Sequence, residues 1–564
     1  MLEGTALRKN IQTLILFCAT IGVAFGAARS PLVESIIKSP DLVALGKIYL
    51  RGILLVIGFT VTVAYRIRGV SEAGVDKINR LAPSFFYGSL LFFTLSLLGL
   101  SIFKLHAFHY YADLANNLEI LWRQTHGLSL TSPMFASRHH GLHWFAAHFA
   151  PIAYIIAYPW FQWFPYPHTL FILETLALAS GAIPIALYAR ERLGPKVGYW
   201  IGAAYLLYPT LHYTDLYDFG FLQFCIPCLA WAFYFLHKRR FVAYSLAVLL
   251  ALICREEVGL TVFLLGLYTL FIKKERWLGL LTAFVGMGYS LFVLTTAMPS
   301  FRTDPGLLYL DAYNQFGSSV MEIIWNLVVH PWKIFSYFLG PIPLGNLVLF
   351  FLPLLFLSLG TPSILLIGSA SFVTSFVTGS ATVVSFMLYY FSASLPFLFF
   401  AATDTIKKMK SWQNKLGICL FASAISCLIV FGPSPISASF FIKEYQLGNF
   451  HSTNFHYSRY RETEHYRLAH DVIALVPPTA IVAAEQAYLP YLFNRQEIRV
   501  FPCVDAAVNY VLIDRKLPER SGCDDNYLDF RARPEFYYQK IESDSAWKLV
   551  KEIDGISLYE RPTP

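Results

Sequence analysis

Long runs of apolar residues alternate with short polar segments over the first three quarters of the chain. An α-helix needs about 20 residues to cross a bilayer, and about 17 suffice. The pattern predicts an all-α polytopic membrane protein with about thirteen spanning helices, at Ile11–Ala28, Lys47–Tyr65, Ser84–Phe103, Thr169–Tyr188, Val197–Leu211, Phe221–Leu236, Phe241–Cys254, Val258–Ile272, Trp277–Met298, Leu344–Leu359, Ser363–Val377, Ser385–Ala402 and Leu416–Phe431.

Basic residues between these runs predict the orientation. Short loops rich in Lys and Arg stay in the cytoplasm, and such clusters lie at 66–80, 190–196, 238–240, 273–276 and 407–415. An even number of crossings must separate them, so Phe149–Phe164 and Val320–Leu339, which carry Pro and polar residues, are expected to lie along the interface. The long polar segments then fall on the non-cytoplasmic side, at Leu105–His148, His212–Gly220, Arg255–Glu257, Pro299–Trp332 and from Pro433 onward.

The chain divides into three parts on this reading. Residues 1–80 hold two extra N-terminal helices, 81–432 the main transmembrane domain with its outer loop 105–148, and 433–564 an extracytoplasmic α/β domain. Arg8 and Lys9 followed by the apolar run Ile11–Ala28 resemble a signal peptide. The run is also long enough to span a membrane, so we favour a first helix that is not cleaved off. The tail is expected to alternate short strands and helices. The expected strands are Thr479–Ala484, Ile498–Phe501, Val508–Ile513 and Ile556–Tyr559, and the expected helices are Glu485–Leu492 and Pro534–Ile541.

Composition agrees with this class. Only 14% of the residues are charged and 56% are hydrophobic, whereas a soluble domain carries about 25% charged residues. The net charge of +8 comes from the loop clusters and forms no basic stripe with interleaved aromatic residues, so nucleic acid is not an expected partner.

The eight cysteines separate into two groups. Cys225 and Cys228 have CxxC spacing, but they lie in an apolar run without a second pair, which favours ordinary core thiols over a metal or redox site. Cys503 and Cys523 are the cysteines of the polar tail. If the tail lies outside the cytoplasm, a disulfide between them is expected.

The first outer loop holds the first candidate chemistry. Asp113 follows an outward-going helix by about ten residues and could act as a general base or hold a metal; alternatively it caps a helix at Leu114–Trp122. His139 and His143 are four residues apart and would share one face of a helix, which could bind a divalent metal. His148 closes the loop.

Two further outer segments carry charge. Tyr217 and Asp218 suit an acidic site beside an aromatic platform, or a turn. Arg255, Glu256 and Glu257 lie between two apolar runs with almost no loop around them. Arg255 could hold a phosphate while Glu256 faces a pocket; the alternative is a turn whose charges compensate one another. Glu174, inside a span, needs a partner and could line the same cavity.

The order of these motifs resembles an uncharacterised family of bacterial polytopic membrane proteins, which in turn resembles the GT-C glycosyltransferases. The resemblance runs from about Leu105 to the end and includes Ala112-Asp113-Leu114, His148-Phe149-Ala150-Pro151, Tyr188-Ala189-Arg190, Tyr208-Pro209, Tyr217-Asp218-Phe219, Arg255-Glu256-Glu257, His330-Pro331 and Asp554-Gly555-Ile556. Leu118 and Gly220 stand where that family usually has Asp and His, and Leu388-Tyr389-Tyr390 replaces a Tyr-His-Tyr pattern.

The resemblance implies a transferase in a bacterial plasma (inner) membrane that moves a sugar from a polyprenyl-phosphate carrier to an extracytoplasmic acceptor. Asp113, Asp218 and Glu256 would be its catalytic residues, with Arg255, His148, Glu257 and Tyr217 at the substrate and a divalent metal as a candidate cofactor. Two alternatives stay open. One is a non-catalytic scaffold of an envelope complex, with protein partners on the C-terminal domain; the other is a transporter of a lipid-linked substrate, which would want ionisable residues at mid-bilayer.

Overall fold

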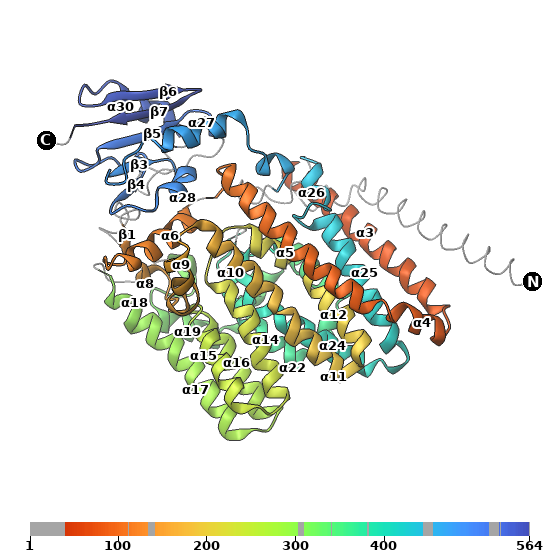
Figure 1. Ribbon diagram of the computed structural model, residues 1–564. Coiled ribbons are helices and arrows are strands. Elements are labelled where there is room, and N and C mark those ends of the chain that lie inside the picture. Colours follow the sequence, from red (N-terminus) through yellow and green to blue (C-terminus); the bar gives the residue numbers. More distant parts are fainter. Residues whose placement is uncertain are drawn as a thin grey trace, which may run out of the picture.

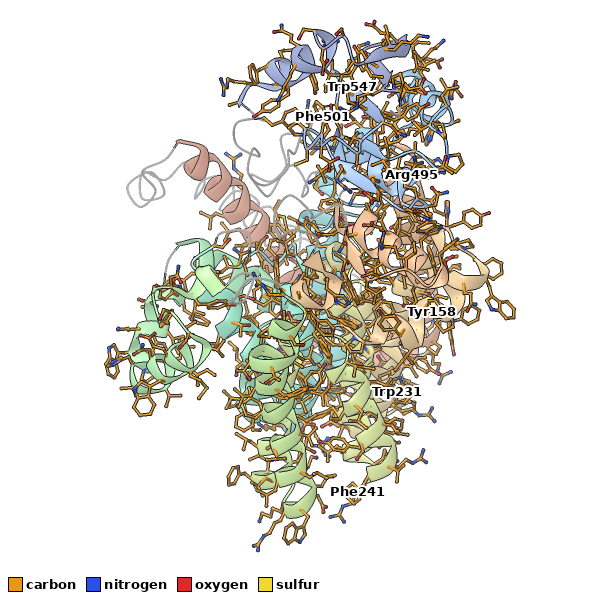
Figure 2. The ribbon with its side chains drawn as sticks, turned by 90° about the vertical axis from the view of Figure 1, so that its left-hand side faces the viewer. Tyr158, Trp231, Phe241, Arg495, Phe501 and Trp547 are labelled. Atoms are coloured by element: carbon orange, nitrogen blue, oxygen red, sulfur yellow. The ribbon has the colours of Figure 1, made fainter. Side chains whose placement is uncertain are left out.

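The computed structural model describes residues 40–110, 112–132, 142–302, 310–339, 341–380, 383–443, 455–517, 530 and 532–562. A helical region forms most of the molecule, and a small sheet domain lies at one end of it (Figure 1). Figure 2 shows the length of the molecule from Trp547 in the sheet domain to Phe241 at the opposite end. The predicted span Ile11–Ala28 lies outside the described residues.

Two long apolar helices, α3 (Pro40–Arg68) and α5 (Ala82–His106), open the helical region. The short polar helix α4 (Glu72–Asn79) lies between them. Ser71 begins α4, because its side chain accepts a hydrogen bond from the Gly74 amide at 3.3 Å. α3 packs along α25 (Gln413–Phe431), and α5 packs against α12 (Pro195–Leu206).

The middle of the chain forms a series of helices joined by short connections. Their bounds are α10 (Pro167–Ser180), α11 (Ala182–Leu193), α13 (Pro209–Leu216), α14 (Cys225–His237), α15 (Phe241–Leu252), α16 (Val258–Phe271) and α17 (Arg276–Phe292). Small residues let α16 and α17 approach closely: a Cβ on Gly266 would lie 2.3 Å from the backbone nitrogen of Ala283. Such close contact is the usual basis of helix association in a membrane.

Shorter helices complete the region. They include α19 (Val320–Val329), α20 (Pro331–Phe338), α21 (Pro341–Phe351), α22 (Pro362–Leu365), α23 (Ser369–Phe376) and α24 (Leu395–Lys408). α19 and α20 leave large apolar side chains exposed, among them Trp325 at 66% and Trp332 at 62%. That this run lies along the membrane interface stays a prediction. The other predicted interfacial run also forms short helices, η2 (Ala153–Ala157) and α9 (Tyr158–Trp163).

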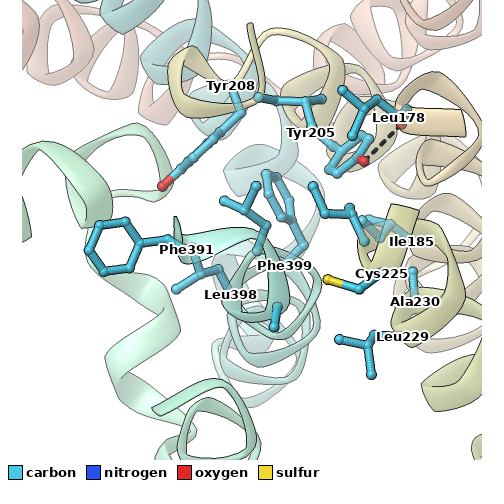
Figure 3. Close-up of a cluster of buried hydrophobic side chains, with 14 of the residues drawn as sticks. Leu178, Ile185, Tyr205, Tyr208, Cys225, Leu229, Ala230, Phe391, Leu398 and Phe399 are labelled. Carbon is cyan, nitrogen blue, oxygen red and sulfur yellow. Dashed lines mark hydrogen bonds between the residues drawn. The ribbon is translucent and has the colours of Figure 1, made fainter. Parts of the chain in front are cut away.

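Aromatic and aliphatic side chains fill the interior of the bundle. Figure 3 shows Tyr205 donating to the Leu178 carbonyl at 2.8 Å, with Cys225 and Phe399 nearby. Cys225 is buried and Cys228 partly buried, both as free cysteines.

Five helices among the described residues are long and apolar enough to cross a membrane, or six if one bent pair counts as a single span. They are Leu50–Arg68, Glu72–His106, Pro167–Leu193, Arg276–Ser300 and Lys410–Phe431. Other predicted spans form shorter apolar helices, including Leu222–His237, Phe241–Leu252 and Val258–Phe271. The polytopic helical class is confirmed, whereas the count of about thirteen crossings stays a prediction.

The basic clusters of the loops meet at the end of the bundle away from the sheet domain. Ion pairs join neighbouring clusters: Lys196 with Asp76, Lys238 with Glu191 (3.0 Å), Arg239 with Glu275, Arg192 with Asp404 (2.8 Å), and Lys415 with Glu72 (3.8 Å). These contacts hold the predicted cytoplasmic loops on one common face, as the count of crossings requires.

The C-terminal domain is a five-stranded mixed sheet in the order β4-β3-β5-β7-β6. Its strands are β3 (Val482–Ala484), β4 (Ile498–Val500), β5 (Tyr510–Asp514), β6 (Lys548–Ile553) and β7 (Ile556–Glu560). β3 pairs in parallel with β4 and β5, and β7 runs antiparallel to β5 and β6. Helices α27 (Glu464–Ile473), α28 (Leu489–Leu492) and α30 (Pro534–Glu542) complete it.

The small α/β domain is therefore confirmed, with one strand more than predicted. β6 escaped the sequence pattern because it is an edge strand whose first five residues are all exposed, so it has no buried face to produce alternation. Cys503 is disulfide-bonded; its predicted partner Cys523 lies outside the described residues.

Candidate functional site

Three of the segments predicted to lie outside the cytoplasm, far apart in sequence, come together at the end of the bundle nearest the sheet domain. Asp113 lies in the first turn of α6 (Ala112–Thr125), Asp218 follows α13, and Arg255 to Glu257 join α15 to α16. Asp113 lies within electrostatic reach of His148 and Arg255, and Asp218 within reach of Asp113. The segments predicted to share one side of the membrane thus share one site.

α6 and the Asp218 turn are tied directly to each other. The Asn117 side chain donates to the carbonyl of Asp113 at 2.8 Å and to that of Phe219 at 3.2 Å. The amide of Phe219 also donates to Asp218 Oδ1 at 2.9 Å. One amide side chain therefore sets the spacing between the two carboxylates.

Asp113 keeps exposed surface, whereas Asp218 is only 4% exposed. Burial nevertheless raises the pKa of Asp113, with His148 and Arg255 offsetting part of the effect. Water therefore reaches the Asp113 side chain, although the surrounding protein disfavours its charged form. The pKa of Asp218 is raised well above its ordinary value by burial and then by the charge of Asp113.

Glu256 is the most firmly held carboxylate of the site. His148 Nδ1 donates to Glu256 Oε1 at 3.2 Å, and the Phe149 amide donates to Oε2 at 2.9 Å. Burial alone would raise the pKa of Glu256, but the His148 hydrogen bond and the charge of Arg255 bring it down to about 2. Glu256 therefore stays ionised and anchors the loop that ends at His148.

Arg255 is surrounded by groups of the same site. Its Nη2 donates to His148 Nε2 at 3.2 Å, and its Nε lies 3.6 Å from Glu256 and 3.4 Å from Glu257. The guanidinium also lies over the Tyr389 ring, 5.8 Å from its centre. Burial raises the pKa of Glu257, which has Arg255 as its compensating charge.

Aromatic side chains complete the site. The ring of Tyr217 lies 5.7 Å from that of Tyr389, which in turn lies 4.7 Å from Tyr390. All three are partly exposed. Aromatic rings therefore lie beside Tyr217, and two of the three belong to Tyr389 and Tyr390. These two residues stand where the family usually has the Tyr-His-Tyr pattern.

Lys104 is a site residue that the sequence reasoning missed. It is 6% exposed, and its Nζ donates to the carbonyls of Leu216 (2.6 Å) and Tyr217. Glu174, 2% exposed, lies behind the site within electrostatic reach of Asp218 and Lys104. A lysine at the end of an apolar span was the available signal, because a charge there needs a cavity or a partner.

The predicted histidine pair takes another form. His143 ends strand β2 (Leu142–His143) and caps α8 (Trp144–Ala147), where its Nδ1 accepts from the Phe145 amide at 3.2 Å. Its ring stacks on Phe301 at 4.4 Å. The expected helix through 139 and 143 is thus wrong at 143, because β1 (Thr131–Ser132) pairs with β2; His139 lies outside the described residues. Within the described part of the chain, no three His, Cys, Asp or Glu residues are grouped to hold a metal ion.

The fold and site define a polytopic integral membrane protein in which carboxylates and Arg255 meet at the end of the bundle nearest a small α/β domain. The chain belongs to the family described as "Predicted membrane protein (DUF2079)", whose profile matches residues 110–558. No curated protein sequence matches the chain. Its structure is similar to the crystal structure of ArnT from Cupriavidus metallidurans bound to undecaprenyl phosphate, with 12% identity, a TM-score of 0.47, and coverage of 83% of this chain and 97% of that one.

Proposed function

We propose that the protein is a GT-C-type glycosyltransferase that moves a sugar from a polyprenyl-phosphate carrier to an acceptor hydroxyl. The observation that supports the proposal is the proximity of Asp113, Asp218 and Arg255 in one site. A base for the acceptor and a cation for the departing phosphate are the two groups that such a transfer needs.

Asp113 is the candidate general base. It is reached by water, unlike Asp218, and its raised pKa brings it closer to neutral pH, where a base is most effective. In the proposed step Asp113 takes the proton of the acceptor hydroxyl, the hydroxyl oxygen bonds to the anomeric carbon, and the bond from that carbon to the phosphate oxygen breaks. Asp218, already desolvated beside it, keeps the pair from losing both protons together.

Arg255 is the candidate phosphate ligand. The guanidinium is held in place by His148 and by two carboxylates, so it would meet the growing negative charge without reorganising. Tyr313 lies within electrostatic reach of Arg255 and Glu257, and the chain runs on from it into α19 and α20 with their exposed apolar side chains. A carrier with its phosphate at Arg255 would have such a surface for its polyprenyl chain.

The proposal includes location. We propose that the basic face of the bundle lies in the cytoplasm of a bacterial cell. The candidate site and the C-terminal domain would then lie outside the plasma (inner) membrane. Labelling of an engineered Lys551→Cys, on exposed strand β6, by an impermeant maleimide in intact spheroplasts should succeed. Labelling of Arg239→Cys at the other end should require lysed cells.

The direct test is to purify the protein with native lipid and identify bound polyprenyl phosphate by mass spectrometry. With that lipid charged as a sugar donor, Asp113→Asn should lower turnover by about 10²–10⁴-fold, the usual contribution of a general base. Unchanged turnover would remove Asp113 from the mechanism.

A scaffold role is the second candidate, and one observation favours it. Leu118, at the position where the family usually has a second Asp, is fully buried in the apolar core. A carboxylate there would have no water and no cation. Absence of polyprenyl phosphate from the purified protein, together with stable envelope proteins in its place, would favour this role.

A further inference from the structure

The segment that leads from α5 into the site adopts an unusual backbone at Phe108. Its φ is +55°, a region that bulky residues rarely enter. Phe108 is nonetheless 1% exposed. A conformation of this kind persists only where the surroundings hold it in place.

The surroundings of Phe108 belong to the C-terminal domain. Four rings of that domain surround it, with centroid distances of 4.6 Å to His470, 4.9 Å to Tyr491, 5.0 Å to Tyr488 and 5.7 Å to Tyr466. Phe108 is part of the same buried cluster as the sheet strands and α27. The outer loop of the membrane domain thus contributes a side chain to the core of another domain, more than 350 residues later in the chain.

Buried hydrogen bonds fix the same segment. Tyr491 Oη donates to the Leu105 carbonyl at 2.9 Å, and Arg459 Nη1 donates to His109 Nδ1 at 2.9 Å. Burial, with the charges of Arg459 and Lys104, lowers the pKa of His109 to about 2, so its Nδ1 is free to accept. Beyond the site, Arg123 Nη1 donates to the Gln496 carbonyl at 2.6 Å.

We propose that the C-terminal domain is a clamp that positions the candidate catalytic helix α6, and that Phe108 is its main positioning residue. The domain holds the chain before Asp113 at Phe108 and His109, and after it at Arg123, so both ends of α6 are attached to it. The inference rests on the proposed function only in naming Asp113 as the group that is positioned.

The clamp also gives a role to the motif Asp554-Gly555-Ile556, which has no part in the proposed transfer reaction. Asp554 and Gly555 form the turn between β6 and β7, with φ of 51° and 86°. Asp554 Oδ2 lies 2.8 Å from His465 Nδ1, and His465 Nε2 lies 2.8 Å from Asp514 Oδ2, which also accepts from Tyr488. Tyr488 is one of the rings around Phe108, so the turn supports the wall against which Phe108 packs.

Hydrogen–deuterium exchange of the full chain in nanodiscs tests the clamp without an activity assay. Phe108→Ala should raise the exchange rate of α6 amides by about tenfold or more, because local opening depends on the lost packing. Phe501→Ala is the matched control: Phe501, labelled in Figure 2, is also 1% exposed in the C-terminal domain, but it packs against Phe530 and Tyr538 in a cluster separate from the one that contains Phe108. It should leave α6 exchange within about twofold of the wild type.

Milder variants cover the case in which Phe108→Ala does not fold. Tyr491→Phe removes only the bond to the Leu105 carbonyl and should raise α6 exchange about two- to fivefold, and Phe108→Leu should restore most of the protection. Equal α6 exchange in Tyr491→Phe, Phe108→Ala and wild type would overturn the clamp, as would an equal increase in Phe501→Ala.

The two proposals fail separately. If α6 exchange responds as expected but Asp113→Asn keeps full turnover, the clamp stands and the transferase chemistry is wrong. If Asp113→Asn is inactive and α6 exchange does not respond, the chemistry stands and the clamp is wrong. With an active enzyme, Phe108→Ala should lower kcat about 10²-fold with little change in KM, as misplacement of a catalytic group does.

Discussion

Two pairs of carboxylates in this protein each come from separate segments of the chain, and the fold surrounds them differently. One is Asp113 with Asp218; the other is Glu485 with Asp514, at the carboxyl ends of the neighbouring strands β3 and β5. Parallel strands of α/β proteins often place a ligand site at such an edge. The structure fills that edge with protein.

The difference lies in how the carboxylates are satisfied. Asp514 is fully buried and accepts from His465, from Tyr488 and from the Lys516 amide at 2.8 Å. Glu485 accepts from the Asp514 amide at 3.1 Å and from Tyr538 at 2.8 Å. Asp113, in contrast, keeps exposed surface while nearby protein desolvates it. A saturated cluster supports structure, whereas a desolvated and accessible one is available for chemistry.

The largest expected effect on stability is in the saturated cluster. Asp514→Asn should lower the free energy of unfolding of the C-terminal domain by about 2–4 kcal/mol, since the NH₂ group of Asn cannot accept a hydrogen bond and leaves buried donors without a partner. Thermal unfolding followed by limited proteolysis of the domain measures this. Asp113→Asn is the matched control and should be neutral or slightly stabilising at pH 7, because a carboxylate whose pKa is raised by folding opposes folding when ionised. Equal losses in both variants would erase the contrast between the two clusters.

Glu256 sharpens the comparison through pH. Its pKa in the folded protein, about 2, lies below its ordinary value of 4.5. The ionised carboxylate therefore stabilises the fold above pH 4.5, and this contribution is lost as pH falls from 4.5 toward 2. Glu256→Gln should cost about 1–3 kcal/mol at pH 7, and the difference from wild type should shrink through that window in unfolding titrations. A difference that stays constant from pH 7 to pH 3 would contradict the assignment.

The smallest expected loss of stability comes from the contact that links the Asp113 and Asp218 segments. Asn117→Ala removes the bonds to the Asp113 and Phe219 carbonyls, so it should cost about 1 kcal/mol of stability and raise exchange at the amide of Phe219. Asn116→Ala, on the adjacent and partly exposed position of α6, is the control. If the two variants behave alike, Asn117 does not set the spacing.

Much of the architecture could be predicted from the chain alone. Apolar runs predicted α5, α10, α17 and α25, because a helix that faces lipid must satisfy its backbone internally and present apolar side chains. Loop charges predicted which ends share a side, and the ion pairs at the basic end agree. Because the loop charges predict the side of each loop, the segments that carry Asp113, Asp218 and Arg255 could be predicted to lie on the same side of the membrane.

The tertiary structure decided the rest. Periodicity could not show that Tyr389 and Tyr390 face Arg255, that Lys104 closes the Asp218 turn, or that Phe108 enters the core of another domain, because these contacts join residues far apart in sequence and leave no local pattern. Nor could it separate the pair of Asp113 and Asp218 from the pair in the sheet domain. Both pairs join carboxylates from separate segments, and the distinction depends on which hydrogen-bond donors the folded chain brings to each carboxylate.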